Sequence, residues 1–225
     1  LAGGFGTRIA DTIGGLPKVL APVHDKPFLF YQMNNWVSLG IKEFTFLLHY
    51  QAELIIEFLE EYKQHNCLDI SYNFILEEKP LGTGGAILNA VVSNNIDDFV
   101  VINADTWIES GFQESFEAVI PSILVTNVNN ASRFGRVNLD SENCVMSFDE
   151  KDGLETPGLI NAGLFSLTRE ILESVQQTKF SLELEVLEPL VKAQNLQAII
   201  SNTNFFDIGV PEDLTGMAIF LASKE

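Results

Sequence analysis

Cysteine and basic residues are both scarce in this sequence. Its 225 residues include 2 cysteines, which are too few for a framework of disulfide bonds. Lysine and arginine number 13 against 31 aspartates and glutamates, and the net charge of −18 repels nucleic acid phosphates and anionic lipids. No uncharged apolar run approaches the roughly 18 residues that a membrane helix needs. The sequence therefore excludes a general nucleic-acid-binding role and predicts a soluble, cytoplasmic protein with no membrane partner.

Histidine is also scarce, and the three histidines are scattered. His24, His49 and His65 lack the spacing of metal ligands and have no obvious serine or cysteine partner. We therefore assign them no catalytic role.

The hydrophobic residues, 46% of the chain, follow an alternating pattern. Apolar strand-like runs alternate with longer segments of helical spacing, which is typical of an α/β sheet with helices on both faces. We predict one Rossmann-like domain over 1–225, with a mixed, mainly parallel sheet whose strands over 123–167 are joined by short turns in a more antiparallel style. The expected helices are 28–39, 52–62, 82–92, 169–175, 183–193 and 212–222, and the expected strands are 43–48, 69–76, 98–104, 123–128, 135–140, 145–149 and 159–167, with Leu1-Ala2 as the last step of a first strand.

A glycine-rich loop, Gly3-Gly4-Phe5-Gly6-Thr7-Arg8, follows that first step. Glycines let successive backbone N–H groups approach phosphate oxygens, although such a loop is also a common tight turn. Lys18 adds a second cation ten residues after Arg8, or is a solvated surface lysine. Asp105 follows an apolar strand, and ligands of open α/β sheets bind at the carboxyl ends of strands. We therefore expect the glycine loop and Asp105 to face one crevice.

These segments resemble the sugar-1-phosphate nucleotidyltransferase family. The family signature is similar to LAGGFGTR followed by LPKVLAPVHDKPFLFY in this chain. The likeness continues through the segments EEKPLGTGG, Asn103-Ala104-Asp105, FDEK, INAG and FDIGVPED. The segments occur in the family's order and span essentially the whole chain. The resemblance implies the nucleotide-diphospho-sugar transferase fold, with a nucleotide-binding half over 1–110 and a sugar-phosphate-binding half over 111–225.

The resemblance also implies a set of catalytic residues. Arg8 and Lys18 would hold the triphosphate and steady the α-phosphate, and Asp105 and Asp207 would bind Mg²⁺, which accepts hard oxygen ligands. The alternative for each aspartate is a helix cap or a turn. The nucleotide would bind to the glycine loop and to the GTG segment, through Leu1, Ala2, Gly3, Gly4, Gly6, Thr7, Glu77, Gly82 and Thr83.

Sugar phosphate binding is implied for a further group of residues. Lys151 would hold the phosphate, Glu150 and Asn161 would bind sugar hydroxyls, and Gly135 would let the backbone approach the sugar. Glu150 lies in a charged run that could equally be a surface turn. Arg133 and Arg136, which flank Phe134-Gly135, stay outside the predicted site.

Glu77 bears on the choice of base. Related enzymes that transfer uridylyl or thymidylyl groups often carry glutamine there, whereas a carboxylate can accept both N1–H and N2–H₂ of guanine. Glu78 could play this part if the register shifts by one residue. The segment Ser181 to Glu185 resembles a family S-L-E-x-D segment with glutamate in place of the aspartate, so the role of Glu185 is open.

Together these residues predict transfer of GMP from GTP to a sugar 1-phosphate, with release of pyrophosphate. The run APVHDKPFLFY resembles most the family members that use D-glycero-α-D-manno-heptose 1-phosphate and make GDP-heptose. The alternatives are mannose or glucose 1-phosphate with GTP, UTP, CTP or dTTP, and a non-catalytic nucleotide-sugar sensor. A homo-oligomer is left open.

Overall fold

The computed structural model describes residues 1–4, 9, 12–149 and 153–224. The chain folds into two compact units. Unit 1 consists of Leu1–Lys79, Ala104–Trp107 and Phe206–Glu225, and unit 2 of Pro80–Asn103 and Ile108–Phe205. Each unit therefore collects segments that are distant in the sequence.

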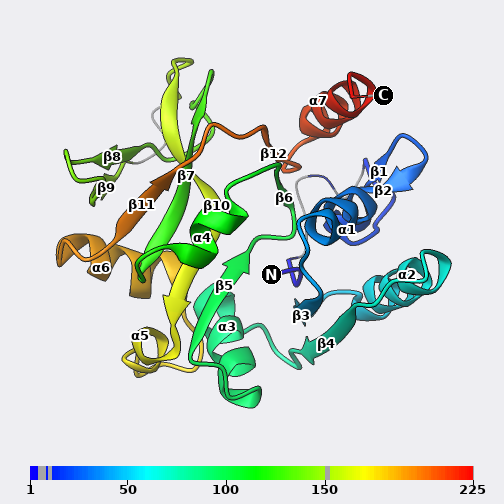
Figure 1. The fold of residues 1–225 in the computed structure, drawn as a ribbon, viewed down its shortest axis with the longest axis horizontal. Helices are drawn as coiled ribbons and strands as arrows, with labels where there is room; N and C mark the ends of the chain where they lie inside the picture. The colour runs from blue at the N-terminus through cyan, green and yellow to red at the C-terminus, as the bar shows by residue number, and fades with distance from the viewer. Residues whose placement is uncertain (5–8, 10–11, 150–152, 225) are drawn as a thin grey trace. The chain divides into compact units, whose positions relative to one another are not determined.

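Unit 1 contains short strands and three longer helices (Figure 1). Its elements are η1 (Lys18–Leu20), β1 (Pro22–Val23), β2 (Lys26–Pro27), α1 (Phe28–Ser38), β3 (Glu43–Leu48), α2 (Ala52–His65), β4 (Ser71–Leu76), β6 (Thr106–Ile108), β12 (Phe205–Asp207) and α7 (Pro211–Ala222), with β6 and β12 each crossing the unit boundary by one residue. β3 pairs with β4 in parallel, from Glu43 opposite Ser71 to Leu48 opposite Leu76. Ala2 N–H donates to the carbonyl of Leu47 over 3.0 Å, and Ala104 N–H donates to that of Leu1 over 3.0 Å. The first two residues thus run beside β3 on one side and Ala104 on the other, although the structure assigns no strand to Leu1-Ala2.

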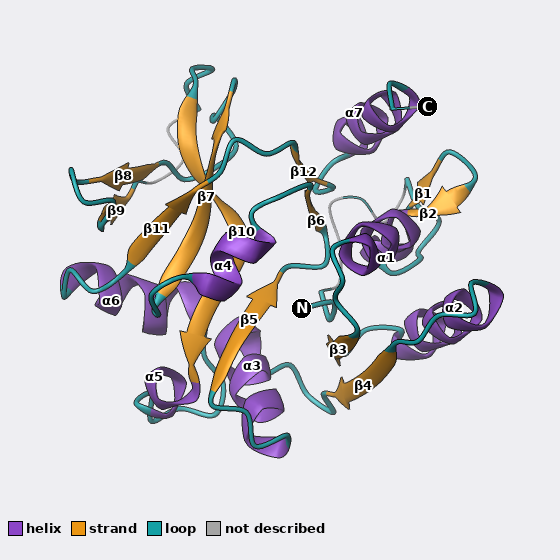
Figure 2. Cartoon of the chain, viewed as in Figure 1, coloured by secondary structure: helices purple, strands orange, loops and turns teal. Residues whose placement is uncertain are grey.

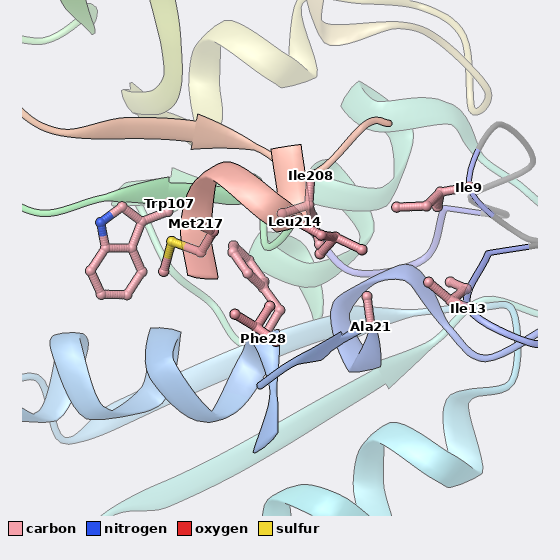
Figure 3. Close-up of a cluster of buried hydrophobic side chains, with 9 residues drawn as sticks. Ile9, Ile13, Ala21, Phe28, Trp107, Ile208, Leu214 and Met217 are labelled. Atoms are coloured by element: carbon pink, nitrogen blue, oxygen red, sulfur yellow. The ribbon is translucent and has the colours of Figure 1, made fainter. Parts of the chain in front are cut away.

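The core of unit 1 joins the two ends of the chain (Figure 3). Phe28, at the start of α1, is 0% exposed, as are Ile208 and Met217 from the C-terminal segment. Burying each such side chain stabilises the fold by about 1.5–3 kcal/mol. The cluster comprises Ile9, Ile13, Ala21, Val23, Phe28, Trp107, Ile208, Leu214 and Met217. Its members Ala21, Trp107 and Ile208 lie within three residues of Lys18, Asp105 and Asp207 along the chain.

Helix α1 has a clear beginning, end and buried face. Pro27 precedes it in an extended conformation, and Gly40 follows it at φ +85°, where the amide of Gly40 donates to the carbonyl of Val37. The buried residues recur at helical spacing, namely Phe28, Leu29, Gln32, Met33 and Trp36. Gln32 is the polar residue in this otherwise apolar stripe.

Unit 2 is built on a four-stranded sheet in the order β11-β7-β10-β5 (Figure 2). Its elements are α3 (Gly82–Ser93), β5 (Asp98–Ile102), α4 (Phe112–Glu117), β7 (Ser122–Val128), β8 (Val137–Leu139), β9 (Val145–Phe148), β10 (Gly158–Thr168), α5 (Arg169–Glu173), η2 (Glu183–Leu187), α6 (Glu188–Lys192) and β11 (Gln197–Ile200). β8 and β9 form a separate antiparallel pair, and α4 packs on β7 and β10.

The predicted α/β alternation is confirmed, but the mainly parallel sheet is not. In the four-stranded sheet β10 runs antiparallel to both β5 and β7, and β11 is parallel to β7. A mainly parallel sheet needs a crossover connection, usually a helix, between successive strands, whereas the sequence indicates short turns and an antiparallel style over 123–167. Between β7 and β10 the chain forms the β8–β9 pair instead, and without a crossover helix it returns in the opposite direction. The sheets are small and mixed.

None of the helices in the described part of the chain combines the length and the apolarity that crossing a membrane requires.

Candidate active site

Lys18 lies between two carboxylates in unit 1. Its ammonium group donates to Asp105 Oδ2 over 2.7 Å and lies 3.3 Å from Asp207 Oδ1. The lysine side chain is 13% exposed, whereas those of Asp105 and Asp207 are 36% and 28% exposed. A cation that bridges residues so far apart in the sequence, and is shielded from water, is more than a surface lysine. The structure thus brings together three of the predicted site residues.

Each of the three side chains sits at the end of a short, fixed segment. Pro17 precedes η1, and its carbonyl accepts a hydrogen bond from Leu20 N–H over 2.8 Å, which closes the turn that carries Lys18. Asp105 lies between β5 and β6, and Asp207 ends β12, the strand that pairs with β6. The amide of Ile208 donates to the carbonyl of Asp105 over 3.1 Å. The β6–β12 pair therefore sets the spacing of the two aspartates.

The cluster holds one positive charge, on Lys18, against the two carboxylates of Asp105 and Asp207. Burial raises the pKa of Asp207 above its ordinary value, and the nearby charge of Asp105 raises it further, whereas Lys18 lowers it. The net effect is a raised pKa, because one lysine does not offset the loss of water and the second carboxylate. The cluster thus favours additional positive charge.

The chemistry of these donors suits Mg²⁺. Two carboxylates supply hard oxygen ligands, and Mg²⁺ in proteins commonly takes one or two carboxylates together with phosphate oxygens and water. Within the described residues no group of three or more His, Cys, Asp or Glu side chains could hold a metal by itself. Asp105 and Asp207 therefore fit a metal that is shared with a phosphate ligand.

A second neighbourhood in unit 1 contains Glu77 and the first residues of the chain. Glu77 follows β4, and its amide donates to the carbonyl of Leu48 over 2.9 Å. His49 follows β3, and its Nδ1 lies 2.7 Å from the carbonyl of Glu77, so this nitrogen carries the proton. A side chain at Gly3 would come within 3.3 Å of His49. Glu77 is half-buried and Glu78 is exposed, which favours Glu77 over its neighbour as a ligand-binding group.

His49, to which the sequence assigns no catalytic role, lies beside Glu77. It lies at the carboxyl edge of the parallel β3–β4 pair, between Gly3 and Glu77. Its place is immediately after a strand, at the edge where α/β sheets bind ligands.

Gly82 and Thr83 lie in unit 2, at the start of α3. Gly82 has φ +75°, and a side chain there would collide with the carbonyl of Phe180. The hydroxyl of Thr83 accepts from Leu182 N–H over 2.8 Å and donates to Glu183 Oε2 over 2.9 Å. Both residues thus fasten α3 to the segment that precedes η2.

The role of Glu185 follows from that same segment. Its carboxylate accepts from Ser181 N–H over 2.8 Å, while Ser181 Oγ accepts from the amides of Glu183 and Leu184 over 3.1 and 3.3 Å. This reciprocal arrangement satisfies N–H groups at a helix start. Glu185 is therefore a helix-capping residue.

The other predicted residues of unit 2 are held by backbone contacts. A side chain at Gly135 would lie 2.8 Å from the carbonyl of Asp149, so the chain passes too closely for any larger residue. Asn161 is half-buried, and its Oδ1 accepts from Gly163 N–H over 2.9 Å at an irregularity in β10. Arg136, which we left out of the site, donates to the carbonyls of Leu154, Thr156 and Pro157 and so braces a loop.

Five predicted site residues, Gly6, Thr7, Arg8, Glu150 and Lys151, lie outside the described residues. Gly4 is described and exposed.

Comparison with known proteins adds the decisive observation. The sequence model of the nucleotidyl transferase family matches residues 1–224. The chain belongs to this family. Curated nucleotidyl transferases at 30% identity or more include D-glycero-alpha-D-manno-heptose 1-phosphate guanylyltransferase of Campylobacter jejuni, which is 36% identical over 95% of this chain and 94% of its own length. Mannose-1-phosphate guanylyltransferase 1 of Arabidopsis thaliana is 31% identical over 99% of this chain, which spans 64% of that protein. This nucleotidyltransferase therefore groups with the sugar-1-phosphate guanylyltransferases.

Solved structures of nucleotidyl transferases agree in fold. HddC from Yersinia pseudotuberculosis, complexed with GMP-PN, superposes with a TM-score of 0.85 at 32% identity and covers 98% of this chain and 96% of its own. UTP-bound UGPase from Acinetobacter baumannii has a TM-score of 0.75 at 18% identity over 100% of this chain and 92% of its own, which shows a shared fold alone.

Proposed function

We propose that this nucleotidyltransferase transfers GMP from GTP to D-glycero-α-D-manno-heptose 1-phosphate. A phosphate oxygen of the sugar 1-phosphate forms a bond to the α-phosphorus of GTP, and the bond from that phosphorus to the β-phosphate bridging oxygen breaks. The products are GDP-heptose and pyrophosphate. The observation that carries the proposal is the shielded Lys18 between Asp105 and Asp207, in a chain that is similar to heptose 1-phosphate guanylyltransferases over nearly its full length.

Lys18 binds and orients phosphate in this proposal. Its ammonium group has three N–H donors, and the two aspartates engage two of them. No acceptor among the described residues engages the third donor, which in this proposal meets an oxygen of the α-phosphate, where negative charge develops during the transfer. Arg8, outside the described residues, would hold the triphosphate with the glycine loop.

Asp105 and Asp207 would hold Mg²⁺. When bound, the ion supplies charge neutralisation for the triphosphate and the departing pyrophosphate. The raised pKa of Asp207 supports this assignment, because a nearby divalent cation would offset both its burial and the charge of Asp105. The two aspartates are fixed by the β6–β12 pairing, so they orient whatever they hold without rearrangement of the backbone.

Glu77 would select guanine. Glu77 is half-buried directly after β4, its backbone carbonyl accepts from His49 Nδ1, and a side chain at Gly3 would come within 3.3 Å of His49. Two adjacent donors of guanine can share one carboxylate, whereas uracil and thymine present a single donor between two acceptors. The GMP-PN complex of the similar HddC supports a guanine nucleotide. Gly82 and Thr83 remain proposed nucleotide-binding residues, and Lys151, Glu150, Asn161 and Gly135 remain proposed sugar-phosphate-binding residues.

Mannose 1-phosphate is the second candidate substrate. It is favoured by the 31% identity to a plant mannose-1-phosphate guanylyltransferase. The greater identity and coverage of the Campylobacter relative favour the heptose. A non-catalytic sensor is disfavoured, because such a protein would not need Lys18, Asp105 and Asp207 together in one partly shielded cluster of charges.

The test is pyrophosphate release with Mg²⁺ across four nucleoside triphosphates, each offered heptose 1-phosphate, mannose 1-phosphate and glucose 1-phosphate. We expect selective release with GTP and the heptose. Release with GTP and mannose 1-phosphate would show that mannose 1-phosphate, not the heptose, is the sugar substrate. Release with UTP would show that Glu77 does not select guanine. Tight binding of a nucleotide sugar without release in any combination would establish the sensor.

A further inference from the structure

Gln32 contacts both residues that flank Asp105. Its residue is 0% exposed, on the buried face of α1. Nε2 lies 2.7 Å from the carbonyl oxygen of Thr106 and 3.4 Å from that of Ala104. Carbonyl oxygens only accept, so the amide group must turn its two N–H donors toward them. One side chain thus holds the backbone immediately before and after a predicted metal ligand.

The amide oxygen of Gln32, Oε1, lowers the stability of the fold. Oε1 is buried and has no hydrogen-bond partner among the described residues. A buried acceptor without a donor lowers the stability of a fold, whereas leucine or methionine would fill this apolar stripe without that penalty. Packing alone therefore does not account for a glutamine here. Its N–H groups do.

Besides Gln32, backbone hydrogen bonds hold the segment around Asp105. Ala104 N–H donates to the carbonyl of Leu1, and the carbonyl of Asp105 accepts from Ile208 N–H. A further anchor is Gln32, which comes from a helix and acts through a side chain. A substitution can therefore remove this anchor while the backbone anchors remain.

We propose that Gln32 is a positioning residue for Asp105. By holding the carbonyls of Ala104 and Thr106 it fixes the Asp105 carboxylate at the place where it meets Lys18 and where it would hold Mg²⁺. Errors of about 1 Å in such placements lower turnover by up to about a hundredfold, and loss of a group that supports a metal ligand lowers metal affinity or activity about 10- to 100-fold. The effect on turnover rests on the proposed function, whereas the anchoring of the segment does not.

The test compares Gln32→Leu and Gln32→Met with the wild type. Tyr31→Phe is the matched control, because the Tyr31 hydroxyl also donates from α1 to a backbone carbonyl, that of Val23, over 3.1 Å. Four quantities are measured: the melting temperature, hydrogen exchange of the peptide over 103–108, Mn²⁺ affinity by electron paramagnetic resonance in the presence of GTP, and kcat and KM for GTP.

In folded Gln32 variants we expect faster exchange over 103–108, Mn²⁺ binding weakened by about 3- to 10-fold, and kcat lowered by about 10- to 100-fold. The KM for GTP should change by less than about 3-fold, because the loss concerns placement of Asp105 rather than nucleotide contacts. The melting temperature should stay near that of the wild type, since the unpaired Oε1 is removed together with the anchor. Tyr31→Phe should match the wild type in exchange, Mn²⁺ affinity and kcat.

Unchanged exchange and Mn²⁺ affinity in a folded Gln32 variant would overturn the proposal. Failure of both variants to fold would also overturn it, because Gln32 would then serve stability. A wild type that releases no pyrophosphate from any substrate pair would instead refute the proposed function. In that case exchange and Mn²⁺ affinity still decide the role of Gln32.

Discussion

The predicted site residues of unit 1 and those of unit 2 are held in opposite ways. In unit 1, Lys18, Asp105 and Asp207 meet through charged side chains, partly shielded from water, and the fold bears an electrostatic cost for them. In unit 2, Thr83 and Asn161 are engaged by the backbone or by neighbouring side chains that complete local structure. A motif residue can therefore owe its place to folding or to chemistry. We expect the electrostatic cost of shielding a charged side chain from water to distinguish the second case from the first.

Asp105→Asn should have the largest effect. The amide keeps the shape but removes the charge that pairs with Lys18 and would bind the metal, so we expect kcat to fall by at least about a thousandfold, a barrier increase of roughly 4 kcal/mol. Steady-state pyrophosphate release measures this, with circular dichroism to confirm the fold. The control is Asp69→Asn, because Asp69 also pairs with a lysine, Lys42, but has a side chain that is 99% exposed. Near-normal turnover in Asp105→Asn would remove Asp105 from the active site.

Glu77→Gln should change the choice of base. Replacing one acceptor oxygen by a donor removes the match to guanine, and we expect the ratio of kcat/KM for GTP over UTP to fall about 10- to 100-fold, equivalent to roughly 1–3 kcal/mol. The matched control is Glu78→Gln on the exposed neighbour. A shift confined to Glu78→Gln would show that the base-reading position is one residue further along.

Asp207→Asn should stabilise the metal-free protein. The pKa of Asp207 is raised in the folded state, so the folded protein binds this proton more tightly than the unfolded chain does. Protonation of Asp207 therefore stabilises the fold fully at acidic pH, and this stabilisation is lost as pH rises through the raised pKa. At neutral pH the ionised carboxylate thus costs stability, and we expect the variant to melt about 2–4 °C higher for each kcal/mol of relief.

That gain should shrink as the pH falls toward 4, where the wild-type carboxyl is increasingly protonated. Asp25→Asn, on an exposed residue, changes the net charge equally and serves as the control. A lower melting temperature for Asp207→Asn at neutral pH would contradict the unbalanced cluster.

Glu185→Ala should have a small effect, on stability alone. Loss of the carboxylate leaves the Ser181 amide without its partner, and removal of a helix cap costs about 0.5–2 kcal/mol. Urea denaturation measures the free energy of unfolding, and kcat should match the wild type. Glu188→Ala, which removes an exposed ion pair with Lys192, is the control and should cost about 0.5 kcal/mol or less. A large loss of kcat in Glu185→Ala would assign this residue to the chemistry after all.

The elements with strong periodicity could be predicted from sequence. The strand over 43–48 is observed as β3 with the same bounds, and the helix over 28–39 is observed as α1 from Phe28 to Ser38. Strands of two or three residues, such as β6 and β12, were missed because they are too short to show a period. The antiparallel direction of β10 agrees with the short turns that the sequence indicates over 123–167, whereas the mainly parallel character predicted for the whole sheet is not observed.

The candidate site divides in a similar way. The family resemblance predicted Lys18, Asp105 and Asp207, and the structure places them in one cluster, while their roles stay predictions. Gln32, which we propose as a positioning residue, was not singled out from the sequence, and the prediction that His49 has no catalytic role stays untested. Gln32 interrupts the apolar stripe of a helix, and His49 follows a strand directly. The role of Glu185 is open from the sequence because glutamate stands where the family segment has aspartate, and the capping bond that the structure shows depends on the local turn.

The central claim is that the Lys18 cluster carries out the transfer. Its most direct test is the Lys18→Met variant, assayed for single-turnover release of pyrophosphate from GTP with heptose 1-phosphate. The control is Lys42→Met, because the side chain of Lys42 is 68% exposed. The predicted result is a folded Lys18 variant whose rate falls about a hundredfold or more, with a much smaller loss of GTP binding, because the ammonium acts on developing charge. A wild-type rate in Lys18→Met, or equal losses in both variants, would contradict the claim.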